Sequence, residues 1–598
     1  MTRPKSDVSA TALGMTPIVG QAAQVRAFGG MAGQAGSPAA LTRMLEAMAE
    51  MKAASLGGVI DQAVAALQKD DFDTGGRLAI QALEMDERSG FAWYLLAIAR
   101  ERAGDFASSV KAYDKALMLI PAHAEVANDM GRLAYRMGLK DTAEKLFAHF
   151  VAANPGNPEG VNNLACAVRD QGRYDEAVEV LRPALIANPE AAVLWNTLGT
   201  VLAEQGDPAG CVTFFDEALR LQPDFPKAQY NRATARHALA DTDGALADCN
   251  TAMAAPMPAD EIQMMRLARS TMRLTLGDLG QGWADYEARR DPAFGDVTHY
   301  LVERPEWTPG DDLAGRSLLI FGEQGLGDEV LFANLIPDVL KALGPNGRLT
   351  LSLEPRLVPL FERSFPKARV GAHATFSVDG RTVRVAPFLD EAELAKIDLW
   401  APMGSLLQDF RSGIAAYPSE PGYLAADPAR VAHWREVLKS APAGPKVGLL
   451  WKSMVAKGAR HRWFSPFTLW EPVLRTPGIC LVNLQYGDCE AELAHAEAQG
   501  IDIWVPPGID LKLDLDDVAA LSCALDLTLG FSNATLNLAG ACGAPVWLVT
   551  PQACWTQLGT DRYPWYPQAR VFTPTTYADW PEVMARMADE LKATFPAS

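Results

Sequence analysis

The chain has 598 residues, a formal net charge of −19 and eight cysteines. This length exceeds what one hydrophobic core supports, so several domains are expected. The acidic charge argues against a general nucleic-acid binder, because such proteins gain most of their affinity from Lys and Arg on phosphates. The cysteines form no Cys-x-x-Cys pair, and no apolar run reaches the roughly 18 residues of a membrane span, so a cytoplasmic protein without a zinc site is expected.

The N-terminal segment divides into two parts by composition. Residues 1–37 are rich in Gly, Ala, Ser, Thr and Pro without a sustained period, which predicts a disordered tail. Residues 38–56 alternate Leu, Met and Ala at helical spacing and predict an amphipathic helix. This helix either caps the helical array that follows, which we favour, or pairs with a second chain.

A repeat with a period of 34 residues occupies the next part of the chain. Its glycines and prolines recur in fixed phase: Gly104, Gly138, Gly172 and Gly206; Pro121, Pro155, Pro189 and Pro223. The period and the placement of aromatic, small and helix-breaking residues resemble the tetratricopeptide repeat (TPR). We therefore expect a TPR solenoid over residues 57–290, with five clear units from Gly90 to Met257, a degraded unit before them and a diverged unit at 276–289.

Three asparagines recur at one position of successive units, early in the first helix. They are Asn128, Asn162 and Asn196. On the concave face of the array, a ladder of amides would donate to and accept from the backbone of an extended acceptor protein. The alternative is local hydrogen bonding near each helix start.

Residues 291–315 hold several prolines and are expected to form a linker. Beyond them, strand-like and helix-like runs alternate, which is typical of doubly wound α/β domains. The strand-like runs are 318–321, 349–353, 447–451, 479–484, 526–531 and 545–550. A Pro-rich break near residue 442 divides them into two Rossmann-like domains, 316–442 and 443–598.

The first strand of this region breaks into a glycine-rich turn and restarts as a helix. Gly325 and Gly327 allow close backbone approach to a ligand, and Asp328 would lie near the helix N-terminus. Asp328 is our candidate general base, and Glu323 on the same loop is the second choice. The alternative for Asp328 is a carboxylate that only interacts with the helix dipole.

Two further loops follow later strands. Lys452, Arg460 and Arg462 belong to a basic cluster that would bind donor phosphate or else form a solvated surface loop. A third loop carries hydroxyl and amide groups that would hold a phosphate or ribose, or else cap the next helix: Ser532, Asn533, Thr535 and Asn537. The pair Asp514 and Asp516 matches a metal-binding signature but leads into a helix, so we expect no metal site.

The residues resemble bacterial proteins in which TPRs precede a GT-B-type glycosyltransferase module. The resemblance rests on three stretches: Gly282-Trp283 with Tyr286-Glu287 and Arg289; Gly322 to Asp328; and Asn537 to Gly540 with Pro545-Val546-Trp547. Similar proteins include the flagellin-modifying glycosyltransferases. The module is also similar to heptosyltransferases, in which the aspartate corresponding to Asp328 acts as base and Lys or Arg residues in the region of 452–462 bind donor phosphate.

This resemblance implies a metal-independent protein O-glycosyltransferase without a resident cofactor. Its TPR domain would bind flagellin, and its GT-B module would transfer a nonulosonic acid of the pseudaminic type from a CMP-activated donor to Ser or Thr, in support of flagellum assembly and motility. Many relatives have Asp-Thr and then His where Ser532-Asn533 and Asn537 stand here. The alternatives are transfer from a UDP-sugar or another nucleotide sugar to another protein or glycan, and a TPR adaptor with a catalytically silent fold.

Overall fold

The computed structural model describes residues 38–293, 297–323, 325–378, 380–453 and 464–596. The tail predicted for 1–37 lies outside this part of the chain. Contacts divide the protein into two compact units, one formed by Met1–Gln205 with Thr213–Pro223 and the other by Gly206–Val212 with Asp224–Ser598.

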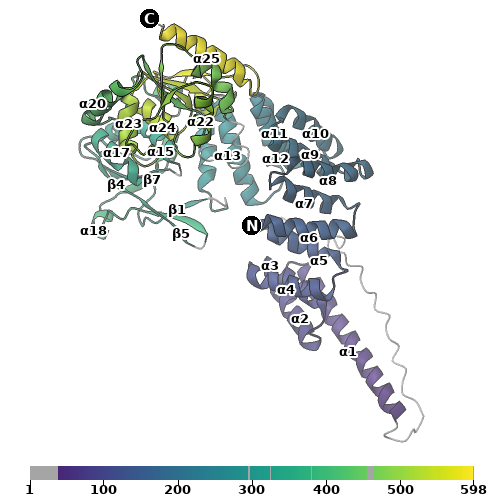
Figure 1. Cartoon of the computed structure of the whole chain (residues 1–598). Coiled ribbons are helices and arrows are strands. Elements are labelled where there is room, and N and C mark those ends of the chain that lie inside the picture. The colour runs from purple at the N-terminus through teal and green to yellow at the C-terminus, as the bar shows by residue number, and fades with distance from the viewer. Residues whose placement is uncertain (1–37, 294–296, 324, 379, 454–463, 597–598) are drawn as a thin grey trace. The chain divides into compact units, whose positions relative to one another are not determined.

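The first unit consists of antiparallel helix pairs that follow one another along the chain (Figure 1). Its helices are α1 (Pro38–Leu67), α2 (Phe72–Met85), α3 (Gly90–Arg102), α4 (Phe106–Leu119), α5 (Ala124–Arg136), α6 (Lys140–Ala153), α7 (Pro158–Arg169), α8 (Tyr174–Ala187) and α9 (Ala192–Gln205), and α10 (Pro208–Leu221) is shared between the two units. The predicted helical repeat is confirmed.

The repeated glycines and prolines have the expected structural causes. Gly104, Gly138 and Gly172 adopt φ values of +83°, +77° and +78° in the turn between the two helices of a repeat, a conformation that side chains disfavour. Pro121 and Pro155 follow the second helices α4 and α6, which they cannot prolong. The glycines therefore mark the turn inside each repeat, and the prolines mark the end of its second helix.

Helix α1 differs from the prediction because it is continuous over 30 residues. The helix at 38–56 and the start of the repeat domain at residue 57 are one element. Ala63 and Leu67, in the last turns of α1 and beyond the predicted helix, are buried against α2 and α3. Met44 and Met48, near the other end, are each 53% exposed.

The second unit begins with α11 (Pro226–Ala238) and α12 (Thr242–Ala254) and continues with α13 (Ala259–Thr275), α14 (Leu279–Tyr286) and the short helix η1 (Glu287–Arg290). The diverged repeat expected at 276–289 corresponds to α14 and η1. These helices pack against the α/β part of the same unit, because Trp283 lies in its main hydrophobic core.

The α/β part contains two parallel sheets and one small mixed sheet (Figure 1). The four-stranded sheet has the order β4-β3-β2-β7, and the six-stranded sheet has the order β10-β9-β8-β11-β12-β13. Their strands are β2 (Ser317–Phe321), β3 (Arg348–Leu353), β4 (Arg369–Ala372), β7 (Leu399–Pro402), β8 (Lys446–Leu450), β9 (Cys480–Asn483), β10 (Ile503–Trp504), β11 (Leu527–Phe531), β12 (Val546–Val549) and β13 (Arg570–Phe572). All six predicted strands are present.

Helices cover these sheets. They are α15 (Leu326–Phe332), α16 (Ile336–Leu343), α17 (Val358–Ser364), α18 (Glu391–Leu394), α19 (Leu407–Phe410), α20 (Pro428–Val437), α21 (Glu471–Leu474), α22 (Glu490–Ala498), α23 (Leu515–Ala524), α24 (Ala534–Ala541) and α25 (Trp580–Thr594). One core joins the four-stranded sheet to α23 and α24, and a second core lies between the six-stranded sheet and α25.

The small sheet corrects the prediction of a linker at 291–315. Strand β1 (Thr298–Tyr300) lies within that stretch and pairs in parallel with β6 (Arg381–Val385), which pairs antiparallel with β5 (Ala374–Val378). The amide of Trp307 also donates to the carbonyl of Trp400 at 2.8 Å. The segment is thus built into the α/β part.

The buried His237 in α11 is expected to make the stability of its repeat sensitive to acid. Burial lowers the pKa of His237 to about 4, and its Nδ1 lies 3.2 Å from Thr242 Oγ1. The unfolded chain binds this proton below about pH 6.5 while the folded chain resists it until about pH 4, so stability falls as the pH drops through this window. We expect His237→Gln to remove on the order of 1–2 kcal/mol of the loss at about pH 5, measured by urea unfolding. His149→Gln, at an exposed position of α6, is the matched control, and an equal loss in both variants would contradict the assignment.

Candidate functional site

The loops that follow two interior strands meet in the second unit. Helix α15 follows β2 of one parallel sheet, and α24 follows β11 of the other. The Asn537 Nδ2 donates to the Gly327 carbonyl at 3.3 Å, and the two helices pack together (Figure 1). Ligands of open α/β sheets bind at the carboxyl ends of the strands, so this junction is the candidate site.

Asp328 lies in the first turn of α15, at the junction. The N-cap of this helix is Gly325, whose carbonyl accepts a hydrogen bond from the Asp328 amide at 3.0 Å. The Asp328 side chain is partly exposed. Burial raises the pKa of the Tyr563 and Tyr286 phenols, and the Asp328 carboxylate adds to both shifts. A carboxylate therefore lies near two phenols that stay protonated at neutral pH.

Glu323 has a different environment. Its side chain is only 3% exposed and forms an ion pair with Arg289, whose Nη2 lies 2.9 Å from Glu323 Oε1. The Gly404 amide donates to the same oxygen at 2.6 Å. This pairing argues against Glu323 as the base, because its lone pairs are committed to fixed donors.

At the start of α24, some of the predicted polar side chains are buried or cap the helix, and others are accessible. The Asn533 Oδ1 caps α24 by accepting from the Leu536 amide at 3.0 Å, whereas its buried Nδ2 has no hydrogen-bond partner among the described residues. Ser532 is exposed, but Thr535 is only 1% exposed. Ser532 and the Asn533 amide nitrogen are therefore the better placed donor-binding candidates, and burial argues against Thr535.

Asn537 links α24 to α15 and to Tyr566. Its Nδ2 binds the Gly327 carbonyl, and its Oδ1 accepts from the Tyr566 hydroxyl at 3.2 Å. Its side chain is 5% exposed. Each end of the amide thus has one partner within the protein, and donor binding by Asn537 stays a prediction.

Lys452 follows β8, which pairs with β11 so that Leu450 is opposite Gly530. The basic segment therefore starts at the same sheet edge as the loop with Ser532. Lys452 forms an ion pair with Glu492. Arg460 and Arg462 lie outside the described residues.

Two of the three repeat asparagines accept hydrogen bonds from neighbouring repeats. Asn163 Nδ2 donates to Asn128 Oδ1 at 3.2 Å, and the Thr197 hydroxyl donates to Asn162 Oδ1. Asn128 is 3% exposed and Asn196 is 8% exposed. These bonds join residues of successive repeats and are not the local hydrogen bonds near each helix start that we gave as the alternative, and acceptor binding stays a prediction.

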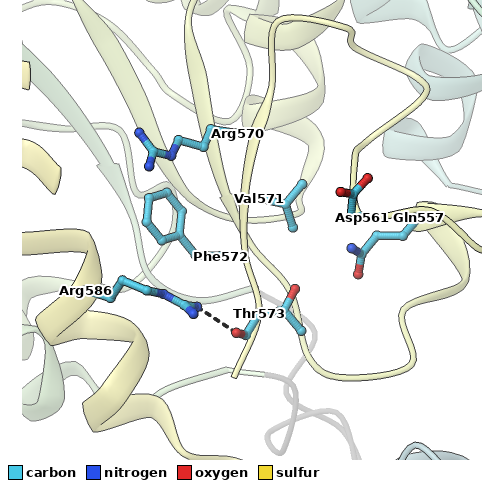
Figure 2. Close-up of a pocket in the computed structure, with 7 residues that line it drawn as sticks. All are labelled: Gln557, Asp561, Arg570, Val571, Phe572, Thr573 and Arg586. Carbon is cyan, nitrogen blue, oxygen red and sulfur yellow. Dashed lines mark hydrogen bonds between the residues drawn. The ribbon is translucent and has the colours of Figure 1, made fainter. Parts of the chain in front are cut away.

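A separate hollow of about 440 Å³ lies beside β13 (Figure 2). It contains none of the predicted residues and is lined by Gln557, Asp561, Arg570, Val571, Phe572, Thr573 and Arg586. Arg570 pairs with Glu590, and Arg586 pairs with Glu582 at 3.2 Å. Each of these two arginines thus has a carboxylate partner.

The Asp514 and Asp516 pair is part of the helix start that we preferred over a metal signature. Asp514 is the N-cap of α23, and Asp516 forms ion pairs with Arg363 and Arg430. Within the described ranges, no group of three or more His, Cys, Asp or Glu side chains is arranged to hold a metal ion. No helix of those ranges is both long and apolar enough to cross a membrane.

Sequence reasoning missed two groups around the junction. Arg384 Nη1 donates to the Gly322 and Glu323 carbonyls at 2.6 and 2.7 Å. The Tyr423 hydroxyl donates to the Val330 carbonyl in α15 at 2.7 Å. Neither residue belongs to a motif, so no signal in one sequence would have identified them.

Comparisons with known proteins agree with the repeat assignment. The tetratricopeptide repeat family matches residues 60–127, 128–192 and 168–236. Protein FlbA of Caulobacter vibrioides is 52% identical over 561 residues, which cover 94% of each chain. Human tetratricopeptide repeat protein 7B is 30% identical over 127 residues, or 21% of this chain and 15% of the human protein.

A solved tetratricopeptide repeat protein from Parabacteroides merdae is also similar. It is 14% identical, with a TM-score of 0.35, and the match covers 39% of this chain and 91% of that protein.

Fold and site together define a TPR protein whose repeats precede two parallel α/β sheets that meet at glycine-rich and amide-rich loops. The chain belongs to the family of Protein FlbA, which it matches over nearly its whole length.

Proposed function

We propose that this protein is a metal-independent protein O-glycosyltransferase of the GT-B type. Its repeats would bind flagellin, and its α/β module would transfer a nonulosonic acid from a CMP-activated donor to a Ser or Thr hydroxyl. The observation that carries the proposal is the hydrogen bond from Asn537 in α24 to Gly327 in α15, which brings the helix that carries Asp328 against the helix that Asn533 caps. Ligands of open parallel sheets bind at the carboxyl ends of the strands, which supports a donor site at this contact.

The chemistry assigns a role to each side of the junction. Asp328 would accept the proton of the acceptor hydroxyl while the hydroxyl oxygen bonds to the anomeric carbon. The bond from that carbon to the phosphate oxygen breaks, and CMP leaves with the electron pair. The N-terminus of α24 and the unsatisfied Asn533 Nδ2 would stabilise the negative charge on the leaving phosphate.

The flagellar acceptor rests on the resemblance to flagellin-modifying enzymes and on the relationship to Protein FlbA. TPR arrays present extended surfaces for protein partners, which supports a protein acceptor. Intact-mass measurement of flagellin from cells with and without this protein tests the proposal. Flagellin should lose its nonulosonic acid mass in the cells that lack the protein, and an unchanged mass would overturn the proposal.

Two other functions would give different results in mass measurements of flagellin from cells or from a purified mixture. A transferase for another nucleotide sugar would remove a mass other than nonulosonic acid. A TPR adaptor with a silent transferase fold would bind flagellin without changing its mass in a purified mixture. The adaptor function is supported by Asn537, because both ends of its amide contact the protein at a position where many relatives have His.

Lys452→Ala should weaken the use of donor while leaving flagellin binding unchanged. Lys452 starts the basic segment beside β11, and a charge-assisted contact to phosphate contributes about 1.5–3 kcal/mol, so we expect the donor KM to rise about tenfold or more. Lys439→Ala is the control, because it removes another lysine of the same charge type from an exposed ion pair. An unchanged donor KM in Lys452→Ala would exclude this residue from the donor site.

A further inference from the structure

The loop that leads into α15 is held by a residue from the end of the repeats. Arg289 belongs to η1, which directly follows α14. Its Nη2 lies 2.9 Å from Glu323 Oε1, and its Nε donates to Glu323 Oε2 at 3.3 Å. Because the guanidinium contacts both oxygens, it fixes the orientation of the carboxylate as well as its charge.

The contacts around Arg289 keep its guanidinium in one place. Its guanidinium carbon lies 4.2 Å from the centre of the Tyr286 ring. Its Nη1 donates to Glu287 Oε1 at 2.7 Å, and its Nη2 donates to the Ser405 hydroxyl at 3.3 Å. The side chain is 6% exposed. All of these partners lie in the repeat end, in the loop or in the turn after β7, so the three segments are held at one point.

The other side of the loop is held equally firmly. Arg384 from β6 donates to the carbonyls of Gly322 and Glu323. The position of Gly404 has no room for a side chain, since a Cβ there would lie 2.8 Å from Glu323 Oε1 and 3.0 Å from Arg289 Nη2. The carbonyls of Gly322 and Glu323 and the carboxylate of Glu323 therefore all have fixed partners.

We propose that Arg289 is a positioning residue for Asp328. It acts through Glu323, which lies at the start of the loop that places Asp328 in the first turn of α15. Here the inference rests on the proposed transfer function. The inference makes the end of the repeats a part of the transferase site. A fragment that begins at residue 316 would therefore lack Arg289, which helps to orient the base.

The prediction is that Arg289→Lys loosens the loop and slows transfer. Lysine keeps the charge but cannot contact both oxygens of Glu323. Hydrogen exchange of the full chain should rise in the peptide that covers 318–334, and kcat should fall at least about tenfold, because small displacements of a catalytic group cost up to about 10²-fold. The donor KM and the affinity for flagellin should stay within about twofold, since Arg289 contacts neither ligand in this account.

Two further variants make the outcome decisive. Leu591→Ala removes a fully buried side chain from the core under α25, so it should lower stability without raising exchange in 318–334 or lowering kcat well below its unfolding temperature. Ser405→Ala removes one hydrogen bond of Arg289 and keeps the ion pair, so it should give the same pattern as Arg289→Lys at smaller amplitude even if Arg289→Lys fails to fold.

The exchange and transfer measurements separate this inference from the function on which it rests. Unchanged exchange in 318–334, or raised exchange with an unchanged kcat, would overturn the role of Arg289. Absence of transfer by the unaltered chain would overturn the proposed function, and the exchange data would still decide whether Arg289 holds the loop.

Discussion

Asp328→Asn is expected to abolish glycosyl transfer while leaving the fold and flagellin binding intact. Asparagine has the size of aspartate but cannot accept the proton of the acceptor hydroxyl. Loss of a general base typically slows a reaction about 10²- to 10⁴-fold. Asp328 lies in the first turn of α15, so the loss of its interaction with the helix dipole costs only about 0.3–1 kcal/mol.

Single-turnover kinetics and intact mass of flagellin measure this effect. Asp73→Asn is the control, because it makes the same chemical change in the first turn of α2. Circular dichroism should give nearly the same unfolding midpoint for both variants. If flagellin carries its full sugar mass with Asp328→Asn, Asp328 is not the base.

Trp283→Ala is expected to destabilise the second unit strongly. The indole is fully buried, and its ring contacts Phe332, Trp555 and Trp565 edge to face at centroid distances of 6.4, 6.1 and 6.2 Å. Its Nε1 donates to the Arg411 carbonyl at 3.0 Å. Removing such a side chain leaves a cavity, and we expect a loss of about 3–5 kcal/mol in the free energy of unfolding.

Urea unfolding followed by near-ultraviolet circular dichroism reports this loss. Trp283→Phe is the matched variant, since it keeps an aromatic ring but loses the hydrogen bond to Arg411. Its loss should be smaller than that of Trp283→Ala. A change below about 1 kcal/mol in Trp283→Ala would mean that the aromatic cluster does not stabilise the unit as its burial suggests.

Local signals explain what the sequence predicted correctly. Glycines with positive φ and prolines after second helices repeat every 34 residues because every repeat forms the same two turns, so composition and spacing predicted the solenoid. The six strands were apolar runs between turn residues, which is the pattern of buried parallel strands. The ends of helices that depend on packing could not be predicted, as the continuous helix α1 shows.

The parts that the sequence did not predict depend on contacts far along the chain. Strand β1 pairs with β6 through Thr298 and Thr382, and neither short strand carries a distinctive pattern alone. At the junction, the sequence located the two loops but not their contact, because the hydrogen bond from Asn537 to Gly327 spans 210 positions. Burial of Glu323 and Thr535 likewise follows from tertiary packing.

The most direct test of the central claim is transfer in a purified mixture. The full chain, unmodified flagellin and a CMP-activated nonulosonic acid would be incubated together, and flagellin would be measured by intact mass. Our account predicts that flagellin gains whole multiples of one nonulosonic acid residue, and gains nothing with Asp328→Asn or with a UDP-sugar as donor. Flagellin that binds the unaltered chain but keeps its mass would contradict the assignment of this protein as a transferase.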